Sequence, residues 1–287
     1  MGKNILHTIE KNMSSFSKGQ KLIARFILEE YDKAAFMTAR KLGKTVQVSE
    51  STVVRFATQL GYDGYPSMQR ALQEMIRGKL TSIQRIRAND TQLSGSDLVA
   101  NVLQQDMEKI RMAIDQTEMV EFEHAVDTIA AAKSIYIVGF RSSSFLAGYL
   151  NFYFRLIFDN VKLVQSGAAG TFDQIFRVGP GDVVIVLSFP RYSEIAIKTM
   201  QYAKDRGATI VGVTDSNLSP IYQMANCSVL VSNLMISFVD SLTAPMSMLN
   251  ALILAVASKS GVDVSASFAE LESVWERFGI FGKVEDD

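Results

Sequence analysis

Apolar residues recur with a helical period along the first 78 residues, which predicts a small all-α bundle. The clearest stripe has four members at positions i, i+3, i+4 and i+7: Val53, Phe56, Ala57 and Leu60. Ser49 stands just before this stripe, where its side chain can cap a helix, and Gly61 stands just after it, where glycine ends helices. The pattern therefore predicts a short amphipathic helix between these two residues.

The same period predicts three more helices in this region. Their expected ranges are 18–31, 39–43 and from Pro66 to about residue 78. Ser17 and Gln20 have the spacing of a capping box at the start of the first, and Thr38 can cap the second. Only a few residues separate the second helix from the helix that follows Ser49. Two short helices joined by such a turn have helix-turn-helix spacing.

From Ser134 onward the pattern changes to that of buried strands. Five short runs are rich in β-branched residues: 134–139, 161–164, 182–188, 209–214 and 227–232. Helical stretches lie between or after them: 143–158, 193–206, 220–225 and 245–260. Apolar strands that alternate with helices predict an α/β fold with a doubly wound, five-stranded parallel sheet covered on both faces. The ligand crevice of such a sheet lies at the carboxyl ends of its strands.

Between the two regions the sequence predicts a linker and two leading helices. Residues 79–96 are polar and weakly periodic, as linkers are. Helices are expected over 97–117 and 119–133. Five apolar residues of the first of these are expected to be buried: Val102, Leu103, Met107, Ile110 and Ile114. The predicted organisation is a helical bundle over 1–78, a linker over 79–96 and an α/β domain over 97–287.

Composition adds an asymmetry of charge. The chain of 287 residues is 48% hydrophobic and 21% charged, which is typical of folded globular proteins and long enough for two domains. Residues 1–90 hold 15 Lys and Arg against 8 Asp and Glu, a net charge of +7, whereas the rest holds 14 against 22, a net charge of −8. A basic first third on an acidic body indicates a nucleic-acid partner for the first part alone.

Cysteine usage and hydropathy bear on location. The single cysteine, Cys227, excludes an internal disulfide and fits a reducing cytoplasm. The first ten residues contain no apolar signal segment. Residues 216–239 carry no charge, but polar side chains interrupt them, so buried core is expected there instead of a membrane span. We therefore expect a cytoplasmic protein with no membrane partner.

The polar face of the helix after Ser49 carries the first candidate site. Small hydroxyls, one amide and one cation are the side chains with which recognition helices reach phosphates and base edges. The predicted DNA-binding residues are Ser49, Ser51, Thr52, Arg55 and Gln59. The alternative is an ordinary amphipathic helix with a polar face toward solvent, and the positive charge of the bundle favours DNA.

Two loops at expected strand ends carry the second candidate site. One runs from Gly139 to Ser144 and the other from Ser188 to Ser193. Each places hydroxyls and an arginine at the start of a helix, where backbone N–H groups and the helix dipole attract anions. The predicted ligand-binding residues are Arg141, Ser142, Ser143, Ser188, Arg191 and Ser193. The alternative is that the serines only cap their helices.

Other chemistries lack their residues. The first loop has no second glycine for a dinucleotide fingerprint, and neither loop has a P-loop lysine. No histidine lies beyond residue 133, which excludes a Ser-His pair in the α/β domain, and one cysteine with two distant histidines predicts no zinc site. Glu194, beside the second loop, is better placed as a favourable charge in a first helical turn. We predict no cofactor, no metal and no catalytic residue.

Together these motifs resemble the RpiR family of bacterial transcriptional regulators. The resemblance rests on Val48–Phe56, Leu60–Pro66 and the two serine loops, and it covers nearly the whole chain. It implies an N-terminal helix-turn-helix joined to a sugar isomerase (SIS) domain. It further implies a homodimer or homotetramer that binds operator DNA and senses a ligand, usually a phosphosugar.

The resemblance also assigns roles within the loops. Three residues match hydroxyl positions that contact phosphate in SIS domains: Ser143, Ser188 and Ser193. Pro190 falls where a third hydroxyl is usual, and Arg141 and Arg191 fall where glycines are usual. Gln47 likewise stands in the helix-turn-helix turn where glycine is common. The two arginines predict an effector whose phosphate or carboxylate they hold jointly.

Three functions stand as expectations. The favoured one is a DNA-binding transcriptional regulator whose SIS domain senses a small anionic metabolite, a phosphosugar or a related acid. The alternative is a sugar-phosphate isomerase that carries a basic helical domain, which the lack of an acid/base pair in the loops disfavours. A third is a SIS-type binding module whose bundle contacts protein, which the charge of +7 on residues 1–90 disfavours.

Overall fold

The computed structural model describes residues 5–77, 83, 98–165, 170–236 and 239–281. The chain divides into two compact units, Met1–Val102 with Met235–Asp240, and Leu103–Leu234 with Ser241–Asp287. The predicted linker, 79–96, lies outside the described residues apart from Ile83. The boundaries predicted for the helical bundle and the α/β domain therefore stay predictions.

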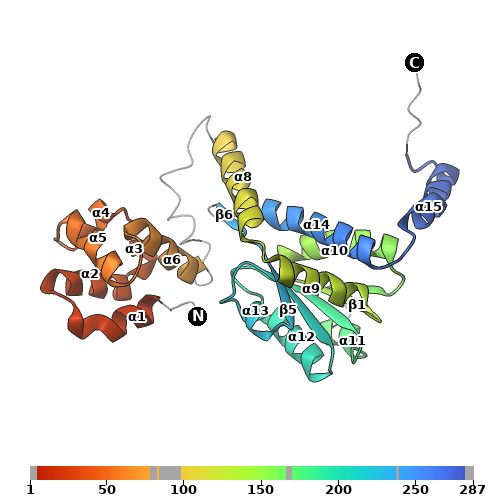
Figure 1. The fold of residues 1–287 in the computed structure, drawn as a ribbon, viewed down its shortest axis with the longest axis horizontal. Coiled ribbons are helices and arrows are strands. Elements are labelled where there is room, and N and C mark those ends of the chain that lie inside the picture. The colour runs from red at the N-terminus through yellow and green to blue at the C-terminus, as the bar shows by residue number, and fades with distance from the viewer. Residues whose placement is uncertain (1–4, 78–82, 84–97, 166–169, 237–238, 282–287) are drawn as a thin grey trace, which may run out of the picture. The chain divides into compact units, whose positions relative to one another are not determined.

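The N-terminal unit is a bundle of short helices (Figure 1). Its helices are α1 (Ile5–Asn12), η1 (Met13–Ser15), α2 (Lys18–Glu29), α3 (Tyr31–Ala34), α4 (Ala39–Thr45), α5 (Glu50–Gln59) and α6 (Tyr65–Arg77). The four predicted helices correspond to α2, α4, α5 and α6. The sequence reading does not predict α1 and α3, because helices of eight and four residues are too short to show a clear period.

The apolar faces of these helices meet in one core. Val53, Phe56 and Ala57 of α5 are fully buried, so the predicted stripe is confirmed. The ring of Phe16, just before α2, packs edge-on against Phe56 with 5.1 Å between the ring centroids. Gly61 ends α5 with a φ of 89°, as predicted from its position. The packing fixes α5 by its apolar side and leaves its polar side outward.

The larger part of the chain alternates strands and helices. Its elements are α8 (Leu98–Gln116), α9 (Met119–Ala130), β1 (Ile135–Gly139), α10 (Ser143–Ile157), β2 (Val161–Val164), α11 (Thr171–Ile175), β3 (Val183–Leu187), α12 (Glu194–Asp205), β4 (Thr209–Thr214), α13 (Pro220–Met224), β5 (Cys227–Leu230), β6 (Leu234–Ile236), β7 (Val239–Ser241), α14 (Thr243–Lys259) and α15 (Val264–Phe278). Strands β1 to β5 form one parallel sheet in the order β2-β1-β3-β4-β5, which confirms the predicted fold class. β6 and β7 pair separately, and the sequence reading predicts neither them nor α11 and α15.

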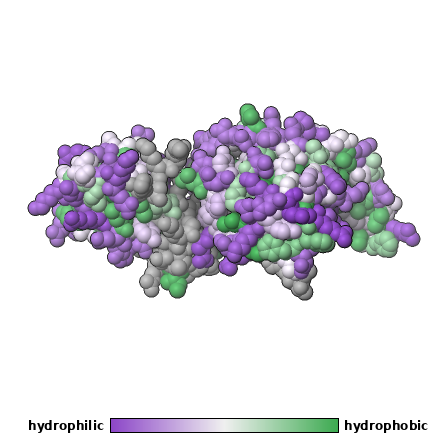
Figure 2. Space-filling view, turned by 90° about the horizontal axis from the view of Figure 1, so that it is seen from below, coloured by the Kyte–Doolittle hydropathy of each residue, from purple (hydrophilic) through white to green (hydrophobic). Residues whose placement is uncertain are grey.

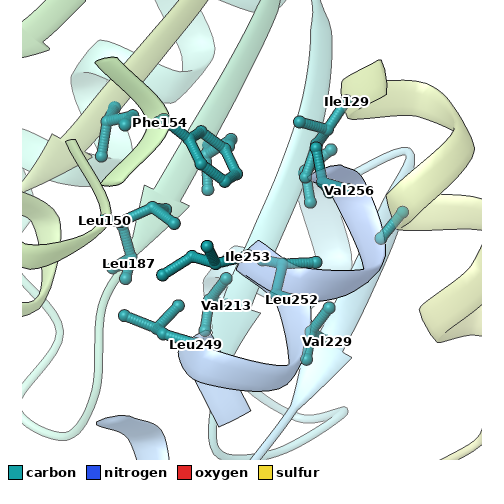
Figure 3. Close-up of a cluster of buried hydrophobic side chains, with 14 of the residues drawn as sticks. Ile129, Leu150, Phe154, Leu187, Val213, Val229, Leu249, Leu252, Ile253 and Val256 are labelled. Atoms are coloured by element: carbon teal, nitrogen blue, oxygen red, sulfur yellow. The ribbon is translucent and has the colours of Figure 1, made fainter. Parts of the chain in front are cut away.

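Helices cover both faces of the five-stranded sheet. Residues of α9, α10 and α14 pack against one face, and residues of α11, α12 and α13 pack against the other. Figure 3 shows the first of these layers, where Phe154 of α10 and Ile253 of α14 meet Leu187 of β3 and Val213 of β4. Because both faces are covered, the central strands β1 and β3 are buried along their whole length, whereas the edge strand β2 carries the exposed Lys162. The helix expected at 245–260 does pack on the sheet, as α14.

α8 departs from the sequence expectation, and the prediction that its apolar residues are buried is wrong. Leu103, Met107 and Ile114 are 58%, 62% and 75% exposed, and Val102 and Ile110 are only partly buried. An apolar stripe predicts burial against some partner, but the pattern cannot say whether the partner belongs to the same chain. Within the described residues α8 keeps most of that stripe in solvent.

The uncharged stretch 216–239 is core only in part. Cys227 and Val229 of β5 and Ile221 of α13 are buried, but Leu218 is 57% exposed, so the expectation of buried core holds for these two elements and not for the loop before α13. Among the described helices, no single one has the length and hydropathy of a membrane span. α14 and α15 reach those criteria only as a pair, with a bend of 110° between them.

Tyr65 of α6 gives a test of the N-terminal core. Its side chain is 3% exposed, and its hydroxyl donates a hydrogen bond to the carbonyl oxygen of Met37 at 2.6 Å. Burial raises the pKa of Tyr65 to about 12. In an unfolded chain the pKa of tyrosine is about 10. The stabilisation linked to this proton is therefore complete below that pH and is lost as the pH rises toward 12.

We expect Tyr65→Phe to lower the free energy of unfolding at pH 7 by roughly 1 kcal/mol. The loss stays small because Gln69 also donates to the Met37 carbonyl, at 2.9 Å. At about pH 11 the difference in the free energy of unfolding between the variant and the wild type should be smaller, since only the wild type loses the stabilisation linked to the Tyr65 proton. Urea unfolding at the two pH values measures both effects, and a difference that does not change with pH would contradict the argument.

Candidate nucleic-acid interface and anion site

The turn between α4 and α5 brings the two helices very close together. Gly43 in α4 has no room for a side chain, because a Cβ there would lie 2.9 Å from the carbonyl oxygen of Val48. The amide of Val48 donates back to the carbonyl of Gly43 at 2.8 Å. Gln47 between them has a φ of 57°, a left-handed conformation that glycine adopts without strain. The observed backbone thus fits the position where the family pattern has glycine.

The start of α5 is a cluster of three hydroxyls. Ser49 caps the helix, and its Oγ accepts a hydrogen bond from the amide of Thr52 at 3.2 Å. The same Oγ lies 2.9 Å from Ser51 Oγ and 2.8 Å from Thr52 Oγ1. Ser49 and Ser51 are exposed and Thr52 is half-buried. The cap prediction is confirmed, and the cluster offers hydroxyl groups beside the positive end of the helix dipole.

The rest of the predicted DNA-binding set continues along the exposed side of α5. The Nε of Arg55 donates to the carbonyl oxygen of Ser51 at 3.4 Å. The Oε1 of Gln59 accepts from Nε2 of Gln20 in α2 at 2.6 Å. All five predicted residues are at least partly accessible, and they lie on one helix opposite its buried stripe. The sequence reading missed Gln20 because residues 39 positions apart show no shared period.

The bundle carries exposed basic side chains on α5 and on three of its other helices. The exposed lysines and arginines of α2, α4, α5 and α6 are Lys18, Arg25, Arg40, Lys41, Lys44, Arg55 and Arg70. Hydrophilic residues cover most of the N-terminal unit on the face that Figure 2 shows. A surface of this kind attracts a polyanion through its phosphates without reading its sequence.

The loop after β1 carries the first half of the predicted anion site. Arg141 is exposed and has a φ of 55°, which again suits the glycine that the family pattern has there. The hydroxyl of Ser144 donates to the carbonyl of Arg141 at 2.6 Å and closes the turn. Ser142 is exposed, whereas Ser143 is 5% exposed, and its hydroxyl makes no hydrogen bond to any residue that the structure describes. A buried hydroxyl without such a partner is a group that a ligand can satisfy.

Glycine is required directly before this loop. A Cβ on Gly139 would lie 2.5 Å from the carbonyl oxygen of Ser143 and 2.8 Å from the Cβ of Ala147. The first turn of α10 therefore packs directly on the end of β1, which brings the backbone amides of that turn to the edge of the sheet.

The loop after β3 carries the second half. Ser188 is 2% exposed, and its Oγ accepts from the amide of Ser193 at 3.2 Å, across the loop that leads into α12. Ser193 is half-buried, Arg191 is exposed, and Pro190 is buried. The side chain of Ser193 makes no cap bond to its own helix. Both serines thus stand at the start of α12, with one hydroxyl already holding the backbone in place.

The strand order brings the two loops together. β1 and β3 are neighbours, and Gly139 pairs with Leu187 in their parallel register. The chain turns from β1 toward β2 on one side and later continues from β3 toward β4 on the other side. α10 and α12 therefore cover opposite faces, and their N-termini flank the point where the strand order reverses. Ligands of such sheets bind at this point.

Three further residues support the loop after β3, and the sequence reading missed them. Thr214, at the end of β4, donates its hydroxyl to the carbonyl of Ser188 at 2.9 Å. Tyr192 donates its hydroxyl to Oδ1 of Asp215 at 2.9 Å. The available signal was their position, since Thr214 ends β4, the strand next to β3, and Asp215 directly follows it. The described residues contain no group of three or more His, Cys, Asp or Glu that suits a metal.

Comparison with known families decides the identity of the two parts. Residues 3–79 match the helix-turn-helix domain of the rpiR family, and residues 128–255 match the SIS domain. The chain belongs to the RpiR family. The resemblance inferred from the motifs around Ser49 and in the serine loops is confirmed.

Some relatives align with nearly the whole of this RpiR-family chain and others with its SIS part. An uncharacterized HTH-type transcriptional regulator of Caldanaerobacter subterraneus is 24% identical over 272 residues, which cover 91% of this chain and 93% of the relative. The NanR protein of Vibrio vulnificus, solved in complex with ManNAc-6P, is 19% identical with a TM-score of 0.58 and covers 97% of this chain and 100% of that chain. The sugar isomerase domain of an RpiR transcription factor from Sphaerobacter thermophilus is 21% identical with a TM-score of 0.59, over 62% of this chain and 99% of that one. Both structures share the fold.

Adjacent serines in the first loop give a test of the anion site. Ser143→Ala removes a buried hydroxyl that has no partner among the described residues, so the free energy of unfolding without ligand should stay the same or rise by up to about 1 kcal/mol. The same variant should lose most of the thermal stabilisation that millimolar inorganic phosphate gives the wild type. Ser144→Ala is the matched control, because it breaks the bond to Arg141 and should destabilise the protein by roughly 1 kcal/mol while phosphate still binds. Equal phosphate stabilisation of Ser143→Ala and the wild type would remove Ser143 from the site.

Proposed function

We propose that this RpiR-family regulator binds operator DNA through α5 and changes its DNA affinity when the SIS domain binds a phosphosugar. The observation that carries the first half is the two-sided character of α5. Val53, Phe56 and Ala57 are fully buried, while the hydroxyls around Ser51, the guanidinium of Arg55 and the amide of Gln59 stay accessible. A rigidly packed helix with such a polar face is what base-edge and phosphate contacts need.

The effector follows from the chemistry of the two loops. The N-termini of α10 and α12 meet at the reversal point of the sheet, with Ser143 and Ser188 buried beside them. Arg141 and Arg191 add two positive charges at the rim. A phosphate group gains charge-assisted hydrogen bonds from all of these donors. The complex of the related NanR with ManNAc-6P supports a sugar phosphate as the class of ligand, and a carboxylate sugar acid is the second candidate.

We infer that the protein is not an isomerase. Sugar-phosphate isomerisation needs an acid and a base within reach of the substrate. Beside the second loop, Glu194 is exposed and faces Lys198 at 3.7 Å on its own helix, and Asp215 accepts a hydrogen bond from the Tyr192 hydroxyl at 2.9 Å. Relatives that align with 77%, 91% and 78% of this chain are named as HTH-type transcriptional regulators. Turnover of aldose or ketose phosphates by the purified protein, lost in Glu194→Gln, would reverse this ranking.

We further propose that the protein works as a homodimer or homotetramer in the cytoplasm, where its DNA partner lies. The outer side of α10 and α14 is apolar, with Phe145, Phe152 and Leu254 being 73%, 56% and 72% exposed. α10 has no charged residue before Arg155, and α14 has none before Lys259. Interfaces between copies are depleted of charge and enriched in aromatic residues. Two copies would also match the two half-sites of an operator.

Sedimentation velocity tests the proposed oligomer. Phe152→Glu places a charge in the proposed interface and should shift the protein toward monomers, because an isologous contact would bury two such charges. Phe172→Glu on α11, a residue that is 41% exposed, is the matched control and should leave the oligomer unchanged. An unchanged sedimentation coefficient for both variants would place the interface elsewhere.

Arg55→Ala tests the DNA half of the proposal. The variant should bind a selected operator roughly tenfold to a hundredfold more weakly, because it loses a base or phosphate contact worth about 1–3 kcal/mol. Its folding should be unchanged, since Arg55 is exposed. Gel-shift titration at several salt concentrations measures the affinity. Wild-type binding should weaken steeply with salt.

The matched control for this experiment is Arg277→Ala on α15. It removes the same charge from the ligand-binding unit and should leave operator affinity within a factor of about two of the wild type. Salt-insensitive binding by the wild type, or equal losses in both variants, would count against α5 as the DNA-reading helix.

Arg141→Gly tests the effector half by separating backbone from side chain. Glycine relieves the left-handed φ of 55°, so the ligand-free protein should gain up to about 1 kcal/mol in the free energy of unfolding. The lost guanidinium should weaken sugar-phosphate binding by roughly tenfold or more. Calorimetric titration with a panel of hexose and N-acetylhexosamine phosphates measures the affinity.

Arg141→Ala is the matched variant, since it loses the same side chain but keeps the strained φ. It should bind sugar phosphates as weakly as the glycine variant without the gain in stability. Arg191→Lys should also bind weakly, because lysine lacks the planar fork of arginine. Wild-type affinity in all three variants would leave the serines as the only assigned ligands.

A further inference from the structure

The capping box of α2 fixes the orientation of one glutamine side chain. The amide of Ser17 donates to Oε1 of Gln20 at 2.9 Å, and the amide of Gln20 faces Ser17 Oγ at 3.4 Å. A backbone N–H can only donate, so the Gln20 atom that faces Ser17 has to be the carbonyl oxygen. The NH2 group of Gln20 therefore points to the other side of its amide.

That NH2 group faces α5 and fixes a second glutamine. Nε2 of Gln20 lies 2.6 Å from the amide oxygen of Gln59. Because the Gln20 group is a donor, Gln59 has to turn its oxygen toward it. The two N–H donors of Gln59 are thereby left on the far side of the amide, on an exposed residue, and they make no hydrogen bond to the described part of the chain.

The packing of α2 on α5 holds this pair in place. Phe16, next to the capping box, stacks edge-on against Phe56 at 5.1 Å. Gly19 lies so close to α5 that a Cβ there would be 3.4 Å from Val48 Cγ1 and 3.5 Å from Thr52 Cγ2. Phe16 and Gly19 both closely precede Gln20 in the sequence. These apolar contacts therefore fix the start of α2 against α5, and the hydrogen-bonded pair of Gln20 and Gln59 lies next to them.

We propose that Gln20 is a positioning residue that makes Gln59 a donor-only contact to DNA, aimed at a phosphate oxygen or at a base-edge acceptor such as guanine O6 or N7. The proposal rests on operator binding through α5. A bidentate contact to adenine uses both the oxygen and the nitrogen of a glutamine amide. Gln59 would have to turn and leave Gln20 to make it. The pair thus biases the C-terminal end of α5 against adenine and toward acceptors.

A double-mutant cycle on operator affinity tests the proposal in the full-length protein. Gln59→Ala should weaken binding by about tenfold to a hundredfold, as expected for one lost contact. Gln20→Ala should weaken binding severalfold in the wild-type background and should have no effect in the Gln59→Ala background. Independent, multiplying effects of the two changes, or no effect of either, would overturn the proposal.

Gln20→Glu separates positioning from helix capping. Its carboxylate still accepts from the Ser17 amide, so the capping box and the melting temperature should be retained. It can no longer donate to Gln59, whose NH2 should turn toward the carboxylate and present the oxygen to DNA. We expect Gln20→Glu to reduce operator affinity by a larger factor when Gln59 is present than when it is added to the Gln59→Ala variant. Because the added charge is the same in both, equal losses would mean that Gln20 acts only by charge, and the proposal would fall.

The outcome also separates this proposal from the broader one. If the wild type binds a selected operator and Arg55→Ala weakens that binding as predicted, while the glutamine cycle shows no coupling, DNA binding through α5 stands and only the role of Gln20 is rejected. If the wild type binds no operator in a salt-dependent way, both are rejected.

Discussion

The ligand-binding unit depends on one constraint of parallel sheets, the reversal of strand order beside β1. The chain leaves β1 toward β2 and resumes at β3 on the other side, so α10 and α12 must cover opposite faces. Their N-termini then converge at one edge, with Gly139 paired to Leu187. Two sets of unpaired backbone N–H groups and two helix dipoles meet there before any side chain is considered. In the proposed anion site, Ser143, Ser188 and the two arginines would add to an environment that the winding of the sheet already creates.

Strained backbone marks both candidate sites. Gln47 and Arg141 are the two non-glycine residues with positive φ among those that the structure describes. Each stands in a turn that leads into a helix with a candidate binding face. An L-residue in this conformation costs roughly 1–2 kcal/mol, and it persists because the packing around it leaves no other choice. At Gln47 the constraint is the contact of Gly43 with the carbonyl of Val48, and at Arg141 it is the direct packing of α10 on Gly139.

Local sequence signals predicted the elements well and the connections between them poorly. The Val53 stripe, the Ser49 cap and the five strands depend on neighbours along the chain, and the structure contains them. The hydrogen bond from Gln20 to Gln59 and that from Tyr192 to Asp215 join distant residues, and no periodicity reports them. The prediction that the apolar residues of α8 are buried was wrong for a different reason. Its apolar stripe predicts burial, but most of that stripe is exposed among the described residues. A pattern in one chain cannot specify whether a partner lies in the same chain or in a second copy.

The energetics of the anion site limit what a ligand can do to DNA binding. Buried hydroxyls and converging N–H groups cost free energy when they lack acceptors, so a phosphate that bound at the proposed site would stabilise the folded unit by mass action. That stabilisation alone does not alter operator affinity. A ligand shifts DNA binding only by the ratio of its affinities for the DNA-competent and DNA-incompetent states. Linkage then requires that operator DNA change the affinity for the sugar phosphate by the same factor. A tight effector with no such reciprocity would therefore be a stabiliser of the SIS fold and not a regulator of α5.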